Sequence, residues 1–442
     1  MMLVYSPKVT NRLRYILDLL LGELLGLSFE LTHDTDAFLN FKGPLINYSM
    51  KPMREEELHV VPSRLLELRG VQHLVPEVKT IERLPCLFPS KKAGNPLGFD
   101  PFSAAFYLVS RYEEYLPFKK DAYGRFEASQ SFAFQHGFLE VPVVNHYALR
   151  IRQELLLRFP FMEFPVRKFS FLPTYDVDVA FAYRGRGALR TLGGTLRELF
   201  QGKFQTAKLR WMVLMGKSKD PFDTYDYQLE LHKKHQLKAF YFFLCGDYGP
   251  FDKNVSFFSG VFQKLVKKIG DYAFTGIHPS FLAHDDPQRL AGEVRRMSNI
   301  TNREILFSRQ HYLRLRFPQT YRNLQENEIT HDFTMGYASQ PGFRAGICSP
   351  FYFYDLELEA VSALKIFPFT VMDGTLKDYL RLQPEEATQT INRLIRAVKS
   401  VEGHFISLWH NESLCECGRW KGWRFVYENM VSQASALQKD KG

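Results

Sequence analysis

The stretch Lys168-Phe-Ser-Phe-Leu-Pro-Thr-Tyr-Asp-Val-Asp178 joins an apolar run to two carboxylates. Its first eight residues, 168–175, are rich in aromatic and other apolar side chains, which is typical of a buried strand. Asp176 and Asp178 follow at positions i and i+2, and alternate residues of a strand point to the same face. We therefore predict a strand that brings two carboxylates to one place.

The chain beyond this stretch repeats the order strand, loop, helix. Such alternation is typical of α/β proteins with a parallel sheet or barrel, which carry their chemistry just past the carboxyl ends of the strands. We therefore predict an α/β fold with a distorted (β/α) barrel. The predicted strands are 239–244, 272–277, 304–308 and 404–409, and the predicted helices are 225–236, 258–269, 286–301, 317–326 and 384–401.

The first third of the chain has its own succession of elements. Helical periodicity runs from 9 to 25, a strand-like run follows at 28–32, and another helical pattern covers 145–159. Asp100 and Pro101 suit the N-cap and the first position of a further helix that continues to residue 115. The segment 159–165 contains two prolines and ends the last of these helices. We therefore predict a smaller α/β or α+β accessory domain over 1–165 and a second domain over 166–442.

The composition is that of a folded globular protein. The chain has 442 residues, of which 45% are hydrophobic and 24% charged, which excludes a wholly disordered chain, a collagen-like fibre and a pure coiled coil. The formal net charge is +9, and no run of five Lys or Arg residues occurs. Nucleic-acid binders concentrate their positive charge, so we expect no nucleic-acid partner.

The apolar segment 15–27 and the five cysteines bear on where the protein is located and on its redox chemistry. The apolar segment 15–27 is interrupted by Asp18 and Glu23, so it fits an amphipathic helix better than a membrane span or an export signal. We expect a cytoplasmic protein without a transmembrane segment, and peripheral association with a membrane stays open. Five cysteines do not form a disulfide framework, and the one-residue spacing of Cys415 and Cys417 does not suit zinc.

Asp176 and Asp178 are the first candidates for chemistry. Two carboxylates held close together repel each other unless a cation neutralises them, which favours a metal ion or an arginine partner. The alternative is a turn or a helix cap, where aspartate is common. The electrostatic argument favours metal binding or acid–base work over the cap.

Histidines follow two of the predicted strands. His278 lies in Gly276-Ile-His-Pro-Ser280, and an imidazole at a strand end is a ready zinc ligand, with a satisfied core histidine as the equal alternative. His284 is a weaker candidate, since Ala283-His-Asp-Asp-Pro287 resembles a solvated helix start. His410 lies at the end of the last predicted strand, next to Trp409. This position favours a functional histidine over one that only caps the end of the strand.

Two arginines are further candidates. Arg309 and His311 lie two residues apart at a predicted strand end, where the guanidinium could hold a carboxylate with a two-pronged contact; a surface ion pair is the alternative. Arg344 lies between Gly342 and Gly346, which would leave its guanidinium accessible. The aromatic run 349–354 beside it either stacks on a sugar ring or belongs to the core.

Taken in order, these segments resemble the NodB-like polysaccharide deacetylases of carbohydrate esterase family 4. The resemblance covers residues 168–411 and implies a distorted (β/α) barrel of the NodB type. The first third resembles the uncharacterised N-terminal domain that accompanies such deacetylases in Bacteroidetes-type bacteria, through residues 4–7, 100–102 and 110–115. The implied activity is metal-dependent hydrolysis of N-acetyl groups on an amino-sugar glycan or glycan precursor.

The resemblance also implies roles for residues of the motifs. Asp176 matches the general base, Asp178 and His278 match metal ligands with Zn²⁺ the favoured ion, and His410 matches the general acid. The family's second histidine, four residues after the first, is Leu282 here, so the third ligand is either His284 or His311.

The later motifs match the family more loosely. Arg309 corresponds to the arginine that orients the base, although the proline of that motif is missing. The last motif has leucine two rather than three residues before His410. We assign Arg344, Trp409 and Tyr312 to substrate binding.

Two other functions fit the same sequence. The pattern Asp176-Val-Asp178 after an apolar strand is also how metal-dependent glycosyltransferases hold a cation on a sugar nucleotide. A non-catalytic sugar-binding relative is the other alternative, and the leucine at position 282 is its main support.

Overall fold

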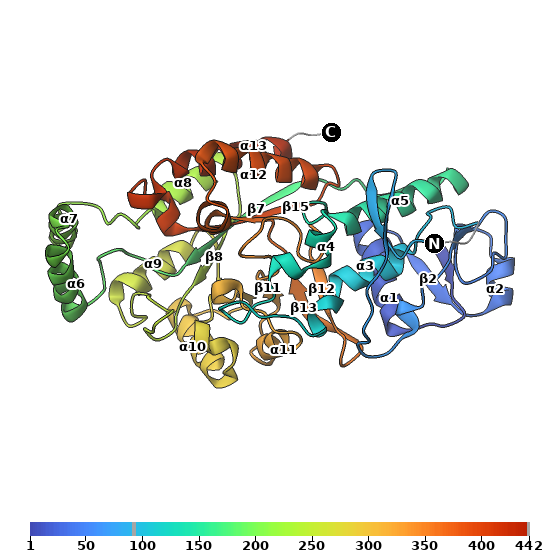
Figure 1. The fold of residues 1–442 in the computed structure, drawn as a ribbon, viewed down its shortest axis with the longest axis horizontal. Coiled ribbons are helices and arrows are strands. Elements are labelled where there is room, and N and C mark those ends of the chain that lie inside the picture. Colours follow the sequence, from blue (N-terminus) through green and yellow to red (C-terminus); the bar gives the residue numbers. More distant parts are fainter. Residues whose placement is uncertain (91–93, 440–442) are drawn as a thin grey trace.

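The computed structural model describes residues 1–90 and 94–439. It shows an elongated α/β protein in which the N-terminal residues form one end and the larger sheet with its helices forms the rest (Figure 1). No helix in the described ranges is long and apolar enough to span a bilayer.

The N-terminal region is built on a small parallel sheet. Its strands β1 (Met2–Tyr5), β2 (Phe29–Thr32), β3 (Leu45–Tyr48) and β4 (Leu58–Val60) lie in the order β2-β1-β3-β4. Strands β1, β3 and β4 are buried along their whole length, as expected for a parallel sheet covered on both faces. An antiparallel hairpin is formed by β5 (Val78–Ile81) and β6 (Leu84–Leu87). The α-helices of this region are α1 (Asn11–Leu17), α2 (Thr35–Asn40), α3 (Pro101–Val109), α4 (Phe132–Gln135) and α5 (Val143–Arg158).

The predicted elements of this region occur, with two changes. The helix predicted to continue to residue 115 ends at Val109, because Arg111 has a positive φ of 54° and a separate 3₁₀ turn covers Tyr112–Tyr115. Asp100 caps α3 by accepting hydrogen bonds from the backbone N–H groups of Phe102 and Ser103, and Pro101 is the first helical residue, as the sequence predicted. The predicted helix over 9–25 is α1 followed by a π-helical turn over Asp18–Leu24. The division at residue 165 stays a prediction.

The larger sheet has nine strands in the described part of the chain. Their order is β12-β13-β11-β10-β9-β8-β7-β15-β14, and every pair is parallel except the hairpin β12–β13. The bounds are β7 (Ser170–Val177), β8 (Phe240–Phe243), β9 (Phe274–Ile277), β10 (Phe307–Ser308), β11 (His331–Asp332), β12 (Phe351–Asp355), β13 (Ala360–Ile366), β14 (Val371–Met372) and β15 (His404–His410).

The sheet curls without closing into a hydrogen-bonded barrel. Side chains from β8, β14 and β15 share one interior cluster with Phe333, which follows β11, so strands distant in the sheet order face one another across it. No strand pairing within 1–90 and 94–439 joins the two edges of the sheet. The α/β prediction is confirmed for the parallel sheet; closure of the predicted barrel is not found.

The helices around this sheet include the five predicted ones, each within three residues of its predicted bounds at either end. Three others were not predicted: α6 and α7, which form a hairpin between β7 and α8, and the last helix, α13. The bounds are α6 (Ala188–Phe200), α7 (Phe204–Leu214), α8 (Tyr225–His235), α9 (Gly260–Gly270), α10 (Pro287–Thr301), α11 (Gln319–Glu326), α12 (Pro384–Lys399) and α13 (Trp423–Lys439).

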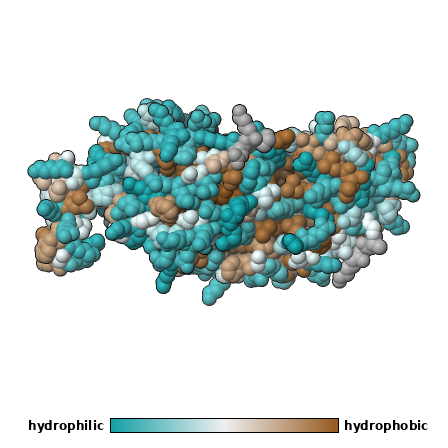
Figure 2. Space-filling model, turned by 90° about the horizontal axis from the view of Figure 1, so that it is seen from above, coloured by the Kyte–Doolittle hydropathy of each residue, from teal (hydrophilic) through white to brown (hydrophobic). Residues whose placement is uncertain are grey.

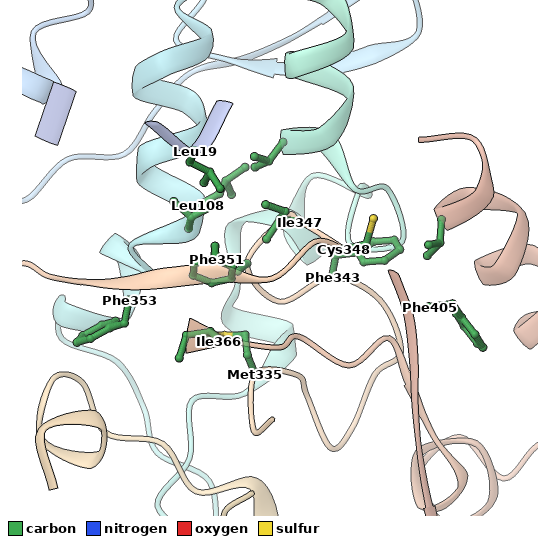
Figure 3. Packing of buried hydrophobic residues seen from close by; sticks show 14 of the residues in the cluster. Leu19, Leu108, Met335, Phe343, Ile347, Cys348, Phe351, Phe353, Ile366 and Phe405 are labelled. Atoms are coloured by element: carbon green, nitrogen blue, oxygen red, sulfur yellow. The ribbon is translucent and has the colours of Figure 1, made fainter. Parts of the chain in front are cut away.

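The two regions share one apolar core. Leu19 and Leu108 of the N-terminal region lie beside Ile347 and Phe351 of the C-terminal region in the same buried cluster (Figure 3). The aromatic run 349–354 contributes the buried side chains of Phe351, Phe353 and Tyr354 to this cluster. These three side chains therefore belong to the core, which was one of the two alternatives for the run, whereas Tyr352 between them is exposed.

Candidate metal centre

The candidate site residues lie at one edge of the larger sheet. Asp178 follows β7, His278 follows β9, His311 follows β10 and His410 is the last residue of β15. These strands are parallel, so their carboxyl ends meet at the same edge. Segments up to 232 residues apart in the chain therefore converge, as the strand–helix alternation predicted.

Asp178, His278 and His311 form the centre of the site. One carboxylate oxygen of Asp178 and one ring nitrogen of each histidine lie within 4.8 Å of one another. The Nε2 atom of His278 is 3.1 Å from Oδ1 of Asp178, and that of His311 is 3.6 Å from Oδ2. Both histidines are buried, whereas Asp178 is partly accessible. The arrangement has the ligand types of a zinc site with three protein ligands.

Hydrogen bonds fix how the two imidazoles are presented. The Nδ1–H of His278 donates to the backbone carbonyl of Arg309 at 2.6 Å, and the Nδ1–H of His311 donates to Oδ1 of Asp252 at 2.8 Å. Both Nε2 atoms consequently face Asp178. A backbone carbonyl or carboxylate on the far nitrogen is the arrangement that orients metal-binding histidines.

The charges of this cluster favour a cation between its members. His311 and the neighbouring imidazoles outweigh burial and hold the pKa of Asp178 well below its usual range. Burial opposes protonation of His311, but Asp178 and Asp252 outweigh it and raise the pKa of His311 to about 9. A protonated His311 or a cation bound between these groups supplies the positive charge that stabilises the ionised Asp178.

One atom of the cluster lacks a hydrogen-bond partner. Among the described residues, the buried Oδ1 of Asp178 accepts no hydrogen bond, although Nε2 of His278 lies 3.1 Å away. Two lone pairs at that distance repel unless a proton or a metal ion lies between them. The donor set and this unsatisfied oxygen both fit a divalent cation.

Asp176 lies beside the cluster and is held by arginine. The Nη1 atom of Arg309 donates to Oδ1 of Asp176 at 2.9 Å, while Nη2 donates to Thr174 Oγ1 at 2.7 Å. Arg309 is fully buried, so the surface ion pair considered for it is excluded. The guanidinium contacts Asp176 with one nitrogen rather than two, because its other nitrogens bond elsewhere. Oδ2 of Asp176 remains on the side of His278, 3.8 Å from its Nε2.

His410 faces the cluster from the next strand. Its Nε2 atom is 3.8 Å from Oδ2 of Asp178, and its Nδ1–H donates to Oδ1 of Asp373 at 2.8 Å. Burial lowers the pKa of His410, but Asp373 and the site aspartates outweigh this and raise it well above the usual value. These carboxylates therefore stabilise the charged form of His410.

A cavity of about 370 Å³ is lined by Asp176, Asp178, His278, His311 and His410. Tyr312 lies on its wall, as the substrate-binding assignment expects. Arg125 of the N-terminal region also lines it, held by Asp121 at 2.7 Å and donating to the backbone carbonyl of Tyr312 at 2.9 Å. The wall of the cavity is therefore shared by both regions of the chain.

His284 and Arg344 lie outside the cavity. His284 is buried beside Thr320, whose hydroxyl is 3.5 Å from its Nδ1, and burial lowers its pKa to about 4. Of the two candidates for the third ligand, the structure brings His311 to the cluster and not His284. The expectation of an accessible Arg344 is wrong, because its guanidinium is buried in an ion pair with Glu114 at 2.6 Å.

Trp409 is also turned away from the cavity. Adjacent residues of a strand point to opposite faces, so with His410 at the site Trp409 faces the helices outside the sheet. It is 1% exposed and packs edge-on against Tyr427 of α13, with ring centroids 5.1 Å apart. The prediction that Trp409 binds substrate is corrected by this alternation.

Sequence reasoning missed three residues that support the site. Asp252 and Asp373 orient the histidines, and Arg125 reaches the cavity from the other region. Asp252 lies in the loop that follows β8, so a search for carboxylates after every predicted strand would have included it. Asp373 directly follows β14, a two-residue strand that was not predicted, so that search would have missed it. The sequence carries no signal that brings Arg125 to the cavity, since that depends on how the regions pack.

Comparisons with known proteins give the following likenesses. Residues 2–160 match a profile described as "Family of unknown function (DUF7033)". No curated protein matches the chain. The chain is similar to a Mycobacterium smegmatis protein described as a polysaccharide deacetylase, with 12% identity and a TM-score of 0.40 over 62% of this chain and 87% of that one.

Two further structures show weaker likeness. A polysaccharide deacetylase from Bacillus cereus has 12% identity and a TM-score of 0.29, covering 60% of this chain and 88% of that one. A pseudoenzyme of the CE4 family from Bacillus anthracis has 15% identity and a TM-score of 0.29, over 61% of each chain, so less than two thirds of its length is matched. At such values the assignment of chemistry rests on the side chains themselves.

Proposed function

We propose that this protein is a metal-dependent hydrolase that removes N-acetyl groups from an amino-sugar-containing glycan or glycan precursor. The observation that carries the proposal is the convergence of Asp178, His278 and His311, with ligand atoms within 4.8 Å of one another, beside a carboxylate and a protonatable imidazole. The order of the sequence motifs between residues 168 and 411 supports the same proposal. The third ligand of the proposal is His311.

A divalent cation, with zinc favoured by two imidazoles and one carboxylate, would be held by Asp178, His278 and His311. Such an ion lowers the pKa of bound water and polarises a carbonyl oxygen. The chain's own contribution is to direct two Nε2 atoms, which must be free of protons when a cation binds, and one ionised carboxylate at a single point.

Asp176 and His410 would handle the protons of the reaction. Asp176 takes the proton of the attacking water on Oδ2, since Oδ1 is occupied by Arg309. His410, charged because Asp373 stabilises its imidazolium, gives the proton on Nε2 to the departing amine. An amine leaves poorly unless it is protonated, so this step requires a proton donor on the leaving-group side.

The cavity wall would bind the sugar. Tyr312 and Tyr379 both line the cavity and offer aromatic surface for a sugar ring, and Arg125 donates to both the Tyr379 hydroxyl and the Tyr312 carbonyl. We assign Tyr312 to substrate binding on this basis. A glycosyltransferase site is less well supported, because Asp176 is engaged by Arg309 and does not share the cluster with Asp178.

The test combines metal content with acetate release from N-acetylglucosamine oligomers. Asp176→Asn should keep zinc and lose acetate release, whereas Asp178→Ala should lose both. Wild-type zinc content in Asp178→Ala, or undiminished turnover in Asp176→Asn, would remove the basis of the mechanism.

His284→Ala is a matched control for the ligand assignment. His311→Ala should weaken zinc binding strongly, while His284→Ala should leave it near the wild-type value. Equal zinc affinities in the two variants would show that His311 is not the third ligand.

A further inference from the structure

Helices α6 and α7 form a hairpin at the end of the molecule opposite the N-terminal region (Figure 1). The hairpin is inserted after β7, ten residues beyond Asp178, and its two helices pack on each other. Arg210 of α7 pairs with Glu198 of α6 at 2.5 Å, and both side chains are nearly buried. No role in the proposed site accounts for this insertion.

The hairpin exposes an apolar stripe on each helix. Leu189, Leu192, Leu196 and Leu199 follow helical spacing on α6, yet each is at least 42% exposed. Of the 29 large apolar side chains that are exposed in the described ranges, nine lie within 189–215. The remaining five of these nine are Phe200, Phe204, Trp211, Leu214 and Met215.

The hairpin is also positively charged. Residues 188–217 contain six Lys and Arg and one Glu, so their net charge is +5. Arg197, Lys203, Lys208 and Lys217 are exposed, and none forms an ion pair with a described residue. Figure 2 shows apolar side chains gathered at this end of the molecule among hydrophilic ones.

We propose that the α6–α7 hairpin is an interfacial anchor that binds the surface of an anionic lipid bilayer. Exposed leucines and aromatic residues beside lysines and arginines are the composition of helices that lie in the membrane interface, with the apolar face among the acyl chains and the basic groups at anionic headgroups. The inference stands on the hairpin alone and does not depend on the proposed hydrolysis.

Charge argues against a second copy of the chain as the occupant of this surface. A two-fold dimer brings the same patch of each subunit together, so two segments of net charge +5 would face each other. An anionic bilayer satisfies both features at once, since it offers negative charge at its surface and apolar volume beneath it.

Trp211 gives a direct spectroscopic readout. It is 41% exposed, whereas Trp409, Trp420 and Trp423 are at most 4% exposed. Insertion of the hairpin should therefore shift tryptophan emission to the blue through Trp211. Trp211→Phe should still sediment with vesicles but lose the shift.

The test is co-sedimentation of the full chain with vesicles. The protein should bind vesicles of phosphatidylglycerol and phosphatidylcholine at least tenfold more strongly than vesicles of phosphatidylcholine alone, and high salt should weaken the binding because it screens the charges. Leu192→Gln/Leu196→Gln/Phe200→Gln and Lys203→Gln/Lys208→Gln should each reduce binding at least tenfold.

Matched controls use exposed residues outside the hairpin. Leu157→Gln removes a 75% exposed leucine on α5, and Lys264→Gln/Lys267→Gln removes two exposed lysines on α9; both should bind like wild type. Failure of the wild type to bind anionic vesicles, or equal binding by the hairpin variants, would overturn the proposal. The proposal would also be overturned if light scattering showed that the wild type is a dimer and that Leu192→Gln/Leu196→Gln/Phe200→Gln is a monomer.

Discussion

At the scale of single residues, the site depends on carboxylates that touch no ligand position themselves. Asp373 is fully buried and accepts two hydrogen bonds from His410, one from Nδ1 and one from the backbone N–H, each 2.8 Å long. Its negative charge raises the pKa of His410, and its position fixes which ring nitrogen faces Asp178. The proton-donating role proposed for His410 therefore rests on Asp373.

Asp373→Asn tests this dependence. The amide keeps the size of the side chain but removes the charge that stabilises the imidazolium, so kcat should fall by about 10²–10⁴-fold, the range that general acid catalysis contributes. Zinc content and KM should stay near the wild-type values, because His410 is not among the proposed ligands. The measurement is steady-state acetate release across pH, and a wild-type kcat in this variant would contradict the role of Asp373.

At the scale of elements, β15 shows how one strand serves two environments. Ile406 and Leu408 lie in the interior cluster of the curled sheet, and His410 continues that face to the cavity. Phe405 and Trp409 belong to the main core outside the sheet. Period-two alternation alone decides that His410 is at the site and Trp409 is not.

Trp409→Ala should act on stability. Truncating a fully buried tryptophan should lower the free energy of unfolding by about 3–5 kcal/mol. Trp211→Ala on the exposed hairpin, as the control, should change it by about 0.5 kcal/mol or less, as for other surface positions. Denaturant titration measures both variants, and an undiminished unfolding free energy for Trp409→Ala would contradict its placement in the core.

At the scale of the whole molecule, a buried ion network joins the two regions. Glu114 accepts hydrogen bonds from Arg344 at 2.6 Å and from Arg111 at 2.8 Å, and all three side chains are at most 2% exposed. Glu114 and Arg344 lie 230 residues apart in the chain. Such a network is costly to disrupt because the remaining charges stay buried without a partner.

Glu114→Gln should therefore cost about 3–5 kcal/mol of unfolding free energy. Glu140→Gln is a matched control, since Glu140 also joins the two regions, through a 2.6 Å contact with Arg393, but with both side chains substantially exposed. Its removal should cost about 1 kcal/mol or less. Equal losses in the two variants would show that burial does not govern this contact.

A buried histidine gives the fold a dependence on pH. Burial lowers the pKa of His232 to about 4, and its ring accepts a hydrogen bond from the Tyr175 hydroxyl at 2.6 Å. The unfolded chain binds a proton there below about pH 6.5 while the folded chain does not, so stability falls as pH decreases from about 6.5 to 4.

His232→Gln should reduce this loss by about 2 kcal/mol between pH 7.5 and 5, which follows from the two pKa values. The exposed His33→Gln should keep the slope of the wild type. Denaturant midpoints at the two pH values provide the comparison, and an unchanged slope in His232→Gln would mean that His232 titrates normally in the folded protein.

The amino-acid sequence determined the elements and the chemical types of the site. Apolar runs and helical periodicity located β7, β8, β9 and β15 and five helices, because these patterns are set by local burial. The same runs ended in Asp176, Asp178, His278 and His410, and parallel strands bring such ends together. The hairpin α6–α7 was missed although Leu189, Leu192, Leu196 and Leu199 recur at helical spacing in the sequence.

Only the tertiary structure decided which of these side chains meet. It brought His311 rather than His284 to Asp178 and paired Arg344 with Glu114 instead of leaving it accessible. It also brought Asp252, Asp373 and Arg125 to the site, and of these three only Asp252 follows a predicted strand. The physical reason is that periodicity records whether a side chain is buried, whereas its partners depend on how distant segments curl and pack against each other.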